Sequence, residues 1–376
     1  MKIGIIGTRG IPNQYGGFEQ FAETFSTRMV EKGHEVTVYN SHRHPYQQKS
    51  YKDVQIVSCY DPEFLLGTAG QFIYDLNCIR DSRKQNFDVI LQLGYTSSTI
   101  WSWLYPKSSI LVTNMDGLEW SRAKYNKAIQ YFLTYAEKWG VRNSDHLIAD
   151  SKGIQEYLRD KYNADAELIP YGADIYESTD DDYSVLAEFS VQPNGYDLLI
   201  ARFEPENNIE TTLKAYTAVP GRKIVLIGNH NDTSFGRRLY KEYGMNPDVV
   251  FSGSIFDPMQ LNALRYHSRL YIHGHSVGGT NPSLLEAMGC NALICAHENQ
   301  FNKHVLGKDA YYFKNSKDLV SIISAPYVKK EQEKWLFNNR LKIANEYNWD
   351  RITEKIETCF NQWKYGEKYR QVLYTV

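Results

Sequence analysis

The chain has 376 residues, 42% of them hydrophobic and 14% aromatic, and its formal net charge is −2. This length suits two domains of ordinary size, and the apolar content is enough for two cores. The near balance of acidic and basic residues excludes a nucleic-acid binder that relies on bulk positive charge.

The five cysteines are scattered and none forms a C-x-x-C pair, which predicts free buried thiols rather than a disulfide framework or a zinc site. The first residues read directly as a core strand, without a signal peptide. No run approaches the roughly 18 apolar residues of a membrane-spanning helix. We therefore expect a cytoplasmic protein.

Short apolar runs alternate with helical periods along the first half of the chain, which favours parallel βα units. Strands are predicted at Ile3–Ile6, Val36–Tyr39, Val54–Val57, Val89–Leu93, Ile110–Val112, His146–Ala149 and Glu167–Ile169. A helix is expected at Phe18–Glu31, because Gly33 follows it where a helix C-cap favours glycine.

A glycine-rich loop, Gly7–Glu19, connects the first strand to this helix. Its glycines permit close approach of a ligand to the backbone, and the helix start behind it favours a phosphate or the oxygens of a sugar. The Gly4-x-x-Gly7-x-x-Gly10 spacing disfavours a dinucleotide fingerprint, and the second strand ends in Tyr39-Asn40-Ser41, without the acidic residue that would hold a ribose. A purely structural glycine turn is the alternative.

Two further segments of the first half are candidates for ligand or membrane contacts. Ser41–Pro45 follows the second strand and could hold a phosphate group, unless it is simply an exposed loop. Trp120–Arg142 is predicted to be helical and is rich in aromatic residues and bases, as at the interface of an anionic membrane. A helix that packs on its own domain, with solvated bases, is the alternative.

The pattern breaks into turn and polar residues over Pro170–Ser190, which predicts a linker. Asp180-Asp181-Asp182 within it is interpreted as a solvated loop rather than a metal-binding motif. A second βα series then follows, with strands at Leu198–Ile200, Ile224–Ile227, Val249–Phe251, Leu270–Ile272 and Ala292–Cys295. The tail from Lys329 is expected to be helical, with a break near Tyr347–Asp350. The fold class is therefore α/β, with two doubly wound domains that meet at about residue 175.

The segment Tyr271–Gly289 contains the clearest ligand-binding pattern of the second half. A strand leads into a glycine turn and then into a helix, with Asn281 expected as N-cap and Pro282 at the first helical position. The N–H groups of that first turn would face a pyrophosphate, and Glu286 would accept hydrogen bonds from a ribose. An ordinary capped helix is the alternative. His273 and His275 are expected on opposite faces of a strand, which favours core or hydrogen-bonding roles over a metal site.

Several segments together resemble the family-4 glycosyltransferases of GT-B fold. They are Tyr15-Gly16-Gly17-x-Glu19, Lys32–Val36, Ala149–Gly153, Ile169–Asp174, Ala201–Asn207 and the helix Asn281–Met288, in the family's order and across nearly the whole chain. Asn114–Trp120 and His273–Pro282 are similar to a bacterial subgroup that includes rhamnosyltransferases of surface-polysaccharide assembly.

This resemblance implies two facing Rossmann-like domains with a cleft between them, an acceptor held by the first and a donor held mainly by the second. We expect the domains at residues 1–175 and 176–347, with the C-terminal helix (about 348–376) crossing back to the first. Such enzymes usually retain the anomeric configuration and require no metal or other cofactor.

The chain departs from the family pattern at three positions. Gly278 stands where the first glutamate of a Glu-x7-Glu pair is expected, and Asp116 stands where a histidine usually touches the sugar. These losses suggest a donor of altered shape, such as a 6-deoxy sugar. Asn208 replaces a lysine that usually neutralises the diphosphate, so another base, Arg9 or Lys303, is expected to assist Arg202.

Together these observations predict a retaining glycosyltransferase that moves a hexose, L-rhamnose from dTDP-rhamnose, onto a lipid-linked saccharide in surface-polysaccharide synthesis. Peripheral contact with the inner membrane is expected, and neither a nucleic-acid partner nor a metal site is. The predicted catalytic residues are Asp116 and Arg202. The predicted donor-binding residues are Arg9, Gly16, Gly17, Thr280, Asn281, Ser283 and Glu286, and the predicted acceptor-binding residues are Glu19, His42, Arg43 and His44. A sugar-nucleotide 2-epimerase and a non-catalytic nucleotide-sugar-binding protein are the alternatives.

Overall fold

The computed structural model describes residues 1–122, 125–325 and 329–366, and it divides into two compact units. The first unit contains residues 1–120, 126–171 and the C-terminal segment from Trp349. The second contains residues 172–348 and the short segment Ser121–Tyr125. The division between the units at Tyr171–Gly172 falls at the start of the segment Pro170–Ser190, which was predicted as a linker.

The first unit is built on an eight-stranded sheet in the order β3-β4-β2-β1-β5-β6-β7-β8. Its strands are β1 Lys2–Ile6, β2 Glu35–Ser41, β3 Ser50–Tyr51, β4 Val54–Cys59, β5 Val89–Leu93, β6 Ile110–Asn114, β7 His146–Ala149 and β8 Glu167–Leu168. All neighbouring strands pair in parallel except β3, which is antiparallel to β4. All of these strands except β3 were predicted. The two residues of β3, Ser50 and Tyr51, do not form an apolar run that would indicate a strand.

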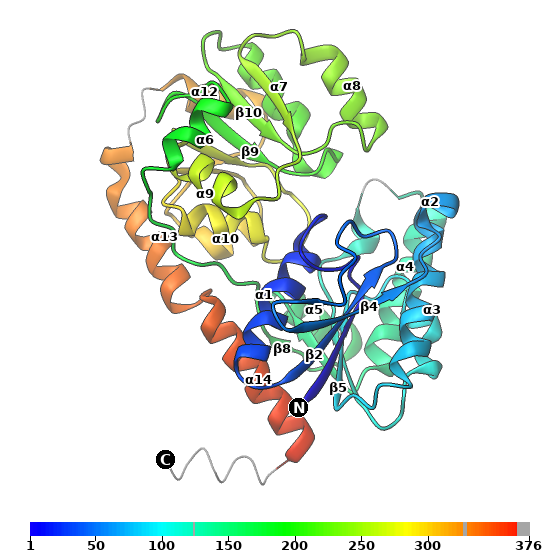
Figure 1. The fold of residues 1–376 in the computed structure, drawn as a ribbon. Helices are drawn as coiled ribbons and strands as arrows, with labels where there is room; N and C mark the ends of the chain where they lie inside the picture. The colour runs from blue at the N-terminus through cyan, green and yellow to red at the C-terminus, as the bar shows by residue number, and fades with distance from the viewer. Residues whose placement is uncertain (123–124, 326–328, 367–376) are drawn as a thin grey trace, which may run out of the picture. The chain divides into compact units, whose positions relative to one another are not determined.

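Helices cover both faces of this sheet. They are α1 Gly17–Glu31, α2 Glu63–Leu66, α3 Gly70–Ser82, α4 Lys127–Asn143, α5 Lys152–Tyr162 and α14 Trp349–Tyr365, with 3₁₀ turns η1 Gly67–Ala69, η2 Thr99–Leu104 and η3 Glu119–Ser121. The C-terminal helix α14 packs on α1, where Trp349 lies 5.8 Å from Phe21 and Phe360 lies 6.2 Å from Phe25, measured between ring centroids. On the opposite side lie α3 and α4 (Figure 1), joined by a contact between Phe72 and Phe132.

The predicted helix Trp120–Arg142 is wrong at its start. The helix α4 begins at Lys127, where the side chain of Asn126 accepts a hydrogen bond from the N–H of Ile129 and caps it. The 3₁₀ turn η3 covers Glu119–Ser121, and residues 123–124 lie outside the described residues.

The second unit is built on a six-stranded parallel sheet in the order β11-β10-β9-β12-β13-β14. Its strands are β9 Asp197–Ile200, β10 Ile224–Ile227, β11 Val249–Gly253, β12 Leu270–His273, β13 Ile294–His297 and β14 Tyr311–Phe313. The three-residue strand β14 was not predicted. The helices are α6 Asp182–Glu188, α7 Ile209–Thr217, α8 Ser234–Tyr243, α9 Pro258–His267, α10 Pro282–Gly289, α11 Gln300–Leu306, α12 Ser316–Ser324 and α13 Glu333–Asn345, with 3₁₀ turns η4 Pro205–Asn207 and η5 Lys329–Gln332.

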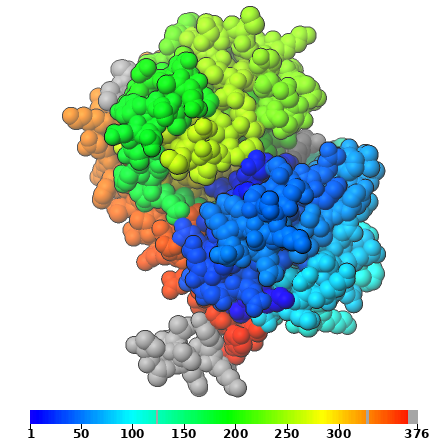
Figure 2. Space-filling view, in the orientation of Figure 1, coloured from blue at the N-terminus to red at the C-terminus, as the bar shows by residue number. Residues whose placement is uncertain are grey.

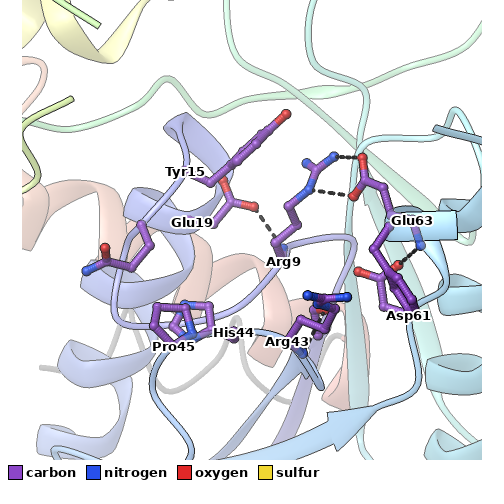
Figure 3. A pocket seen from close by; sticks show the side chains of 11 residues that line it. Arg9, Tyr15, Glu19, Arg43, His44, Pro45, Asp61 and Glu63 are labelled. Atoms are coloured by element: carbon purple, nitrogen blue, oxygen red, sulfur yellow. Dashed lines mark hydrogen bonds and ion pairs between the residues drawn. The ribbon is translucent and has the colours of Figure 1, made fainter. Parts of the chain in front are cut away.

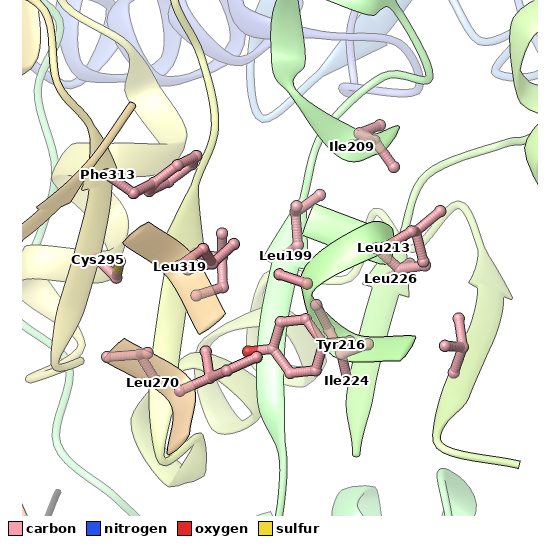
Figure 4. Close-up of a cluster of buried hydrophobic side chains, with 14 of the residues drawn as sticks. Leu199, Ile209, Leu213, Tyr216, Ile224, Leu226, Leu270, Cys295, Phe313 and Leu319 are labelled. Atoms are coloured by element: carbon pink, nitrogen blue, oxygen red, sulfur yellow. The ribbon is translucent and has the colours of Figure 1, made fainter. Parts of the chain in front are cut away.

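The core of the second unit packs apolar side chains of the strands against α7 and α12 (Figure 4). One polar network lies inside it. Tyr216 donates a hydrogen bond of 2.6 Å to Asp197, and Arg269 forms an ion pair with the same carboxylate. These partners offset part of the cost of burying the carboxylate, and burial still raises the pKa of Asp197 above its ordinary value. All five cysteines are free and buried, as predicted.

The predicted solvated loop Asp180–Asp182 is wrong for its last residue. Helix α6 begins at Asp182 and lies at the surface of the second unit (Figure 2), but the Asp182 side chain is buried. It accepts hydrogen bonds from Tyr176 at 2.6 Å and Ser178 at 2.9 Å, and it pairs with His267. These contacts explain why a carboxylate in a polar stretch of sequence is removed from water.

Candidate functional site

The strand order of the second unit reverses between β9 and β12. The chain runs from β9 outward through β10 and β11 and then returns to β12 on the other side of β9. In open α/β sheets, ligands bind at the carboxyl ends of the strands at such a reversal. Arg202 follows β9, and His275 and the turn before α10 follow β12, so residues from two distant predicted motifs meet at one edge.

Arg202 is exposed at this edge, and its side chain forms no ion pair with any other described residue. Its backbone carbonyl is instead held by the side chain of Asn207 at 2.7 Å. The other candidate base of this unit, Lys303, pairs with Glu298 at 2.7 Å. Arg202 is therefore the cation that is available to an anionic ligand at the end of β9.

The loops after β9 and β12 are tied to each other by hydrogen bonds. Ser276 donates from its N–H and its hydroxyl to the carbonyl of Glu206, at 3.0 and 2.8 Å. Asn208 donates from its side chain to the carbonyl of Gly274 at 2.8 Å. A Cβ on Gly274 would collide with the carbonyl of Asn207. The asparagine in place of the family's lysine thus fastens one loop to the other.

Helix α10 starts as predicted, with Asn281 as N-cap and Pro282 at the first position. The N–H groups of its first turn are engaged within the helix start, because the side-chain oxygen of Asn281 accepts the N–H of Ser283 at 3.0 Å and its hydroxyl at 2.9 Å. Pro282 has no N–H, and the N–H groups of Leu284 and Leu285 bond to the carbonyl of Asn281. An anion at this helix start must displace the Asn281 side chain. Thr280 is buried just before it.

Glu286 lies one turn into α10 and is partly buried. One of its carboxylate oxygens is held by the guanidinium of Arg265, which is buried beneath it on α9. The pairing orients the carboxylate from the protein side. It also gives Glu286 a structural role that the sequence pattern did not indicate.

Gly278 has a φ of +122°, a conformation that residues with side chains rarely adopt. A Cβ there would meet no neighbouring atom, so the obstacle to a glutamate is the backbone and not the space. The turn in this conformation therefore favours glycine at position 278 over the glutamate that the sequence resemblance implies.

His273 and His275 were expected on opposite faces of the strand, which is wrong. Residues two apart along an extended chain lie on the same face, and the two rings stack at 4.5 Å with an interplanar angle of 16°, although the strand β12 itself ends at His273. Burial lowers the pKa of His273 well below its ordinary value. Burial also lowers the pKa of His275 to about 3, and the charges of Arg202 and Arg122 act in the same direction. Both imidazoles are neutral near pH 7.

Buried polar atoms gather at this edge. Both ring nitrogens of His273, Nδ1 of His275 and both carboxylate oxygens of Glu206 have no hydrogen-bond partner among the described residues, although Arg122 lies 3.8 Å from Glu206. Such atoms in a native structure require an explanation, and a polar ligand or bound water is one. Glu206 belongs to the segment Ala201–Asn207 but was not predicted as a site residue, because its burial depends on the tertiary structure.

The first unit contains a pocket of about 270 Å³ at the carboxyl ends of β1, β2 and β4 (Figure 3). It is lined by Arg9, Gln14, Tyr15, Glu19, Ser41, Arg43, His44, Pro45, Asp61, Glu63 and Phe64. The pocket joins the glycine-rich loop to the segment that follows the second strand. It therefore brings together Arg9, predicted for the donor, with three of the residues predicted for the acceptor.

Arg9 is held in place inside this pocket. Its guanidinium donates two hydrogen bonds to Glu63, at 3.0 and 2.7 Å, and lies 3.8 Å from the centre of the Tyr15 ring. Burial is the largest single influence and opposes the charge of Arg9. The hydrogen-bonded Glu63 together with Tyr15 and Glu19 outweighs burial, so that the pKa of Arg9 is raised. A base that is neutralised in this way is a weaker candidate for a diphosphate partner than Arg202.

Glu19 is buried, and one of its oxygens accepts the Arg9 N–H at 2.8 Å and the Thr8 hydroxyl at 3.2 Å. These bonds shape the glycine-rich loop, where Gly16 is the extended residue before α1 and Gly17 its first residue. A Cβ on Gly16 would make only an ordinary contact with Glu19, so space does not require glycine there.

The histidines on either side of Arg43 hold the loop that carries it. His44 is buried, accepts the N–H of Tyr46 on Nδ1 and therefore donates from Nε2 to the carbonyl of Pro12 at 3.0 Å. His42 accepts the N–H of Asp61 and does not line the pocket. Arg43 is exposed and lies 4.3 Å from the centre of the Phe64 ring, with no ion pair to a described residue.

Asp61, Glu63 and Phe64 were not predicted as site residues, and they complete the pocket from the end of β4. Figure 3 shows Asp61 and Glu63 there. Asp61 accepts the N–H of Glu63 at 2.9 Å and thereby orders the start of α2. Their position after a predicted strand was the one signal available in the sequence. Asp61 lies two residues after the end of β4, as Arg43 lies two residues after the end of β2.

Asp116 follows β6 and has a φ of +50°, which is uncommon outside glycine, asparagine and aspartate. Its N–H donates to the side chain of Asn114 at 3.0 Å. Aspartate is also a common helix N-cap, but the backbone of Asp116 does not fit that role, because a cap residue normally has an extended backbone and only the 3₁₀ turn η3 follows.

Two classes of feature are absent from the parts of the chain that the structure describes. No group of three or more histidine, cysteine, aspartate or glutamate side chains is placed to hold a metal ion. Within residues 1–122, 125–325 and 329–366, no helix has the length and apolar character needed to cross a bilayer.

The chain is similar to one family model and to several solved structures. Residues 1–174 match the family model "Domain of unknown function (DUF1972)". No curated protein sequence matches the chain. Sucrose-phosphate synthase from Thermosynechococcus elongatus has a similar structure, with a TM-score of 0.77 at 17% identity over 100% of both chains.

Two further solved structures have the same architecture. Anabaena Alr3699/HepE in complex with UDP and glucose has a TM-score of 0.74 at 15% identity, over 96% of this chain and 99% of that chain. WaaG, a glycosyltransferase involved in lipopolysaccharide biosynthesis, has a TM-score of 0.68 at 12% identity, over 96% and 99%. The fold is therefore that of the GT-B glycosyltransferases, as predicted, with two units that each carry a sheet of mostly parallel strands flanked by helices.

The same fold occurs in a protein described as a UDP-N-acetylglucosamine 2-epimerase from Listeria monocytogenes, at a lower TM-score of 0.60 and 12% identity. At such identities the similarity establishes the fold and not the reaction.

Proposed function

We propose that the chain is a retaining glycosyltransferase that takes a hexose from a nucleotide sugar and moves it onto a saccharide acceptor. The observation that carries the proposal is the edge of the second unit where Arg202, after β9, and the Asn281-capped helix, after β12, meet at the reversal of strand order. The crystal structure of HepE with UDP and glucose, a protein of the same fold, supports a nucleotide-sugar donor.

The proposed mechanism is charge stabilisation of the leaving group. As the glycosidic bond stretches, negative charge accumulates on the diphosphate, and the exposed Arg202 guanidinium stabilises it. The Asn281 side chain gives way to the diphosphate and frees the Ser283 N–H, which then donates to it. The neutral His275 beside Arg202 adds no competing charge.

The acceptor hydroxyl attacks on the face that the leaving group vacates, and the departing phosphate takes its proton. This route requires no carboxylate nucleophile. Asp116 orients a hydroxyl of the donor or acceptor from the end of β6. Glu286, held by Arg265, accepts hydrogen bonds from the ribose. No metal takes part in this scheme.

We propose L-rhamnose from dTDP-rhamnose as the donor and a lipid-linked saccharide of surface-polysaccharide synthesis as the acceptor, met at the cytoplasmic face of the inner membrane. The backbone at Gly278 disfavours the glutamate that would grip a hexose, and Asp116 replaces a histidine, which together suit a 6-deoxy sugar. The pocket that contains Arg9, Glu19 and Arg43 is proposed to hold the acceptor.

A thermal-shift panel tests the donor. Because a ligand that binds only the folded state raises the melting temperature, dTDP-rhamnose should stabilise the protein more than dTDP-glucose, UDP-glucose or GDP-mannose. Equal shifts with all four would contradict the choice of donor, and no shift with any would contradict the proposed class.

A sugar-nucleotide 2-epimerase of the same fold is the second candidate, favoured by the similarity to the Listeria protein. An epimerase converts the donor without an acceptor, whereas a transferase releases nucleotide diphosphate in proportion to glycosylated product. A protein that only binds the donor does neither.

A further inference from the structure

The helical side of the first unit exposes an unusual amount of apolar surface. The segment Phe64–Ala69, which forms α2 and η1, is exposed at every residue and reads Phe-Leu-Leu-Gly-Thr-Ala. Leu65 is 67% exposed and Leu66 is 53% exposed. Single exposed apolar residues are ordinary, but a consecutive exposed run is not, unless it serves a function.

Neighbouring elements extend this apolar surface. Gly70, the first residue of α3, packs against the backbone of α2 so closely that a Cβ would collide with Glu63. The next turn of α3 exposes Ile73, and η2, which contacts both α3 and α4, carries Trp103 at 73% exposure. Figure 1 shows α2, α3 and α4 together on one side of the first unit.

Helix α4 presents an aromatic stripe. Tyr131, Tyr135 and Trp139 follow one another at intervals of four residues, with ring centroids 5.1 and 6.3 Å apart. All three are exposed, so the stripe faces away from the core that buries Leu133 and Ala136. Residues at this spacing share one face of a helix.

The exposed charges of α4 are all positive. Lys127, Lys138 and Arg142 are exposed and lie on or beside the aromatic stripe. The one acid of this helix, Glu137, is buried and pairs with Lys161 at 2.9 Å. Arg43 adds a further exposed base against the ring of Phe64. The surface thus combines apolar and aromatic side chains with a single sign of charge.

We propose that this surface, formed by Phe64–Ala69, Trp103 and the α4 stripe, binds an anionic lipid bilayer. Aromatic side chains favour the level of the lipid head groups, and bases beside them attract anionic lipids. The aromatic stripe of α4 carries exposed bases and no exposed acid, and a protein partner with a neutral or basic surface gives no reason for that single sign of charge. A second copy would have to place like charges opposite one another.

The position of Phe64 connects the bilayer to the acceptor pocket. Phe64 begins the exposed run and also lines the pocket with Arg9 and Arg43. A lipid-linked acceptor whose chain stays in the bilayer would therefore enter the pocket past Arg43, with its phosphate at the level of the bases. This second step rests on the proposed function, whereas bilayer binding does not.

Co-sedimentation of the full chain with vesicles, without donor or acceptor, tests the proposal. The protein should partition onto phosphatidylglycerol–phosphatidylcholine vesicles and not onto vesicles of phosphatidylcholine alone. The triple variant Lys127→Gln/Lys138→Gln/Arg142→Gln should bind about a hundredfold more weakly, at roughly fivefold per charge. Leu65→Ser/Leu66→Ser should bind at least about tenfold more weakly.

Matched variants of the second unit serve as controls. Lys241→Gln/Lys308→Gln/Lys317→Gln removes the same charge from exposed positions, and Met245→Ser/Phe337→Ser removes exposed apolar side chains, Met245 being 95% exposed. Both should bind like the parent. All changed side chains are exposed, so the melting temperatures should agree, which is checked for each variant.

Three results would overturn the inference. In the first, the parent does not bind anionic vesicles at all, and in the second, the test and control variants lose vesicle binding equally. In the third result, the test variants lose the protein's concentration-dependent self-association and keep their binding to vesicles. The last would identify an interface between copies. A chain that binds vesicles but transfers no sugar would contradict the proposed function alone, and one that transfers sugar to a soluble acceptor without binding vesicles would contradict the surface alone.

Discussion

The guanidinium of Arg265 on α9 is buried against the carboxylate of Glu286 on α10, and the two residues are 21 positions apart in the chain. This pair joins the residue proposed to hold the ribose to the core of the second unit. It means that a change at Glu286 affects both ligand binding and stability, and the two effects must be separated.

Glu286→Ala should lower the free energy of unfolding by about 3 kcal/mol, because it leaves the Arg265 charge buried without its partner. The double variant Arg265→Met/Glu286→Leu removes both charges and should recover most of that loss, as measured by denaturant unfolding. It should still fail to bind the donor in calorimetry. Donor binding by this stable double variant would refute the assignment of Glu286 to the ribose.

Arg202→Ala should reduce kcat/KM by at least a hundredfold, which corresponds to about 3 kcal/mol of transition-state stabilisation. The melting temperature should not change, because the side chain is exposed and has no ion pair with another described residue. Arg237→Ala, on the exposed surface of α8, is the control and should retain full activity. A loss below tenfold would show that a different cation stabilises the diphosphate.

Asp116→Asn should lower turnover roughly 10²–10⁴-fold without a change in melting temperature. Asparagine tolerates the positive φ of this position, so the substitution changes the charge and not the backbone. Asp116→Val, by contrast, should lower the melting temperature, because a β-branched residue is strained there. Near-normal turnover by Asp116→Asn would remove this residue from the proposed mechanism.

The stacked His275 should make the folded protein less stable in acid. Burial, assisted by the nearby arginine charges, lowers the pKa of His275 to about 3 from an ordinary value of 6.5. Between these values the unfolded chain binds a proton that the folded protein does not, so stability falls as pH falls from about 6.5 to about 3, by up to ~1.4 kcal/mol per pH unit. In urea unfolding, the free energy of unfolding of His275→Gln should fall less steeply with pH than that of the parent, by up to ~1.4 kcal/mol per pH unit. Identical slopes would contradict the lowered pKa.

Signals between near neighbours in the chain predicted much of this molecule. The apolar runs at Ile3–Ile6 and Ile224–Ile227 are strands because side chains alternate within a few residues and need no distant partner to be recognised. The cap at Asn281 and Pro282 is equally local, since a helix start depends on the next three residues. The order of the glycosyltransferase-like segments then indicated the fold.

Distant pairings were decided by the tertiary structure. Whether Asp182 is solvated depends on His267, whether the Ser283 N–H is free depends on the rotamer of Asn281, and whether Arg9 can meet a diphosphate depends on Glu63. The acceptor pocket exists because β1, β2 and β4 are neighbours, so that loops about 30 and 50 residues apart end at the same edge. Burial and ion pairing are properties of packed surfaces, and no local pattern of residue types specifies which surfaces meet.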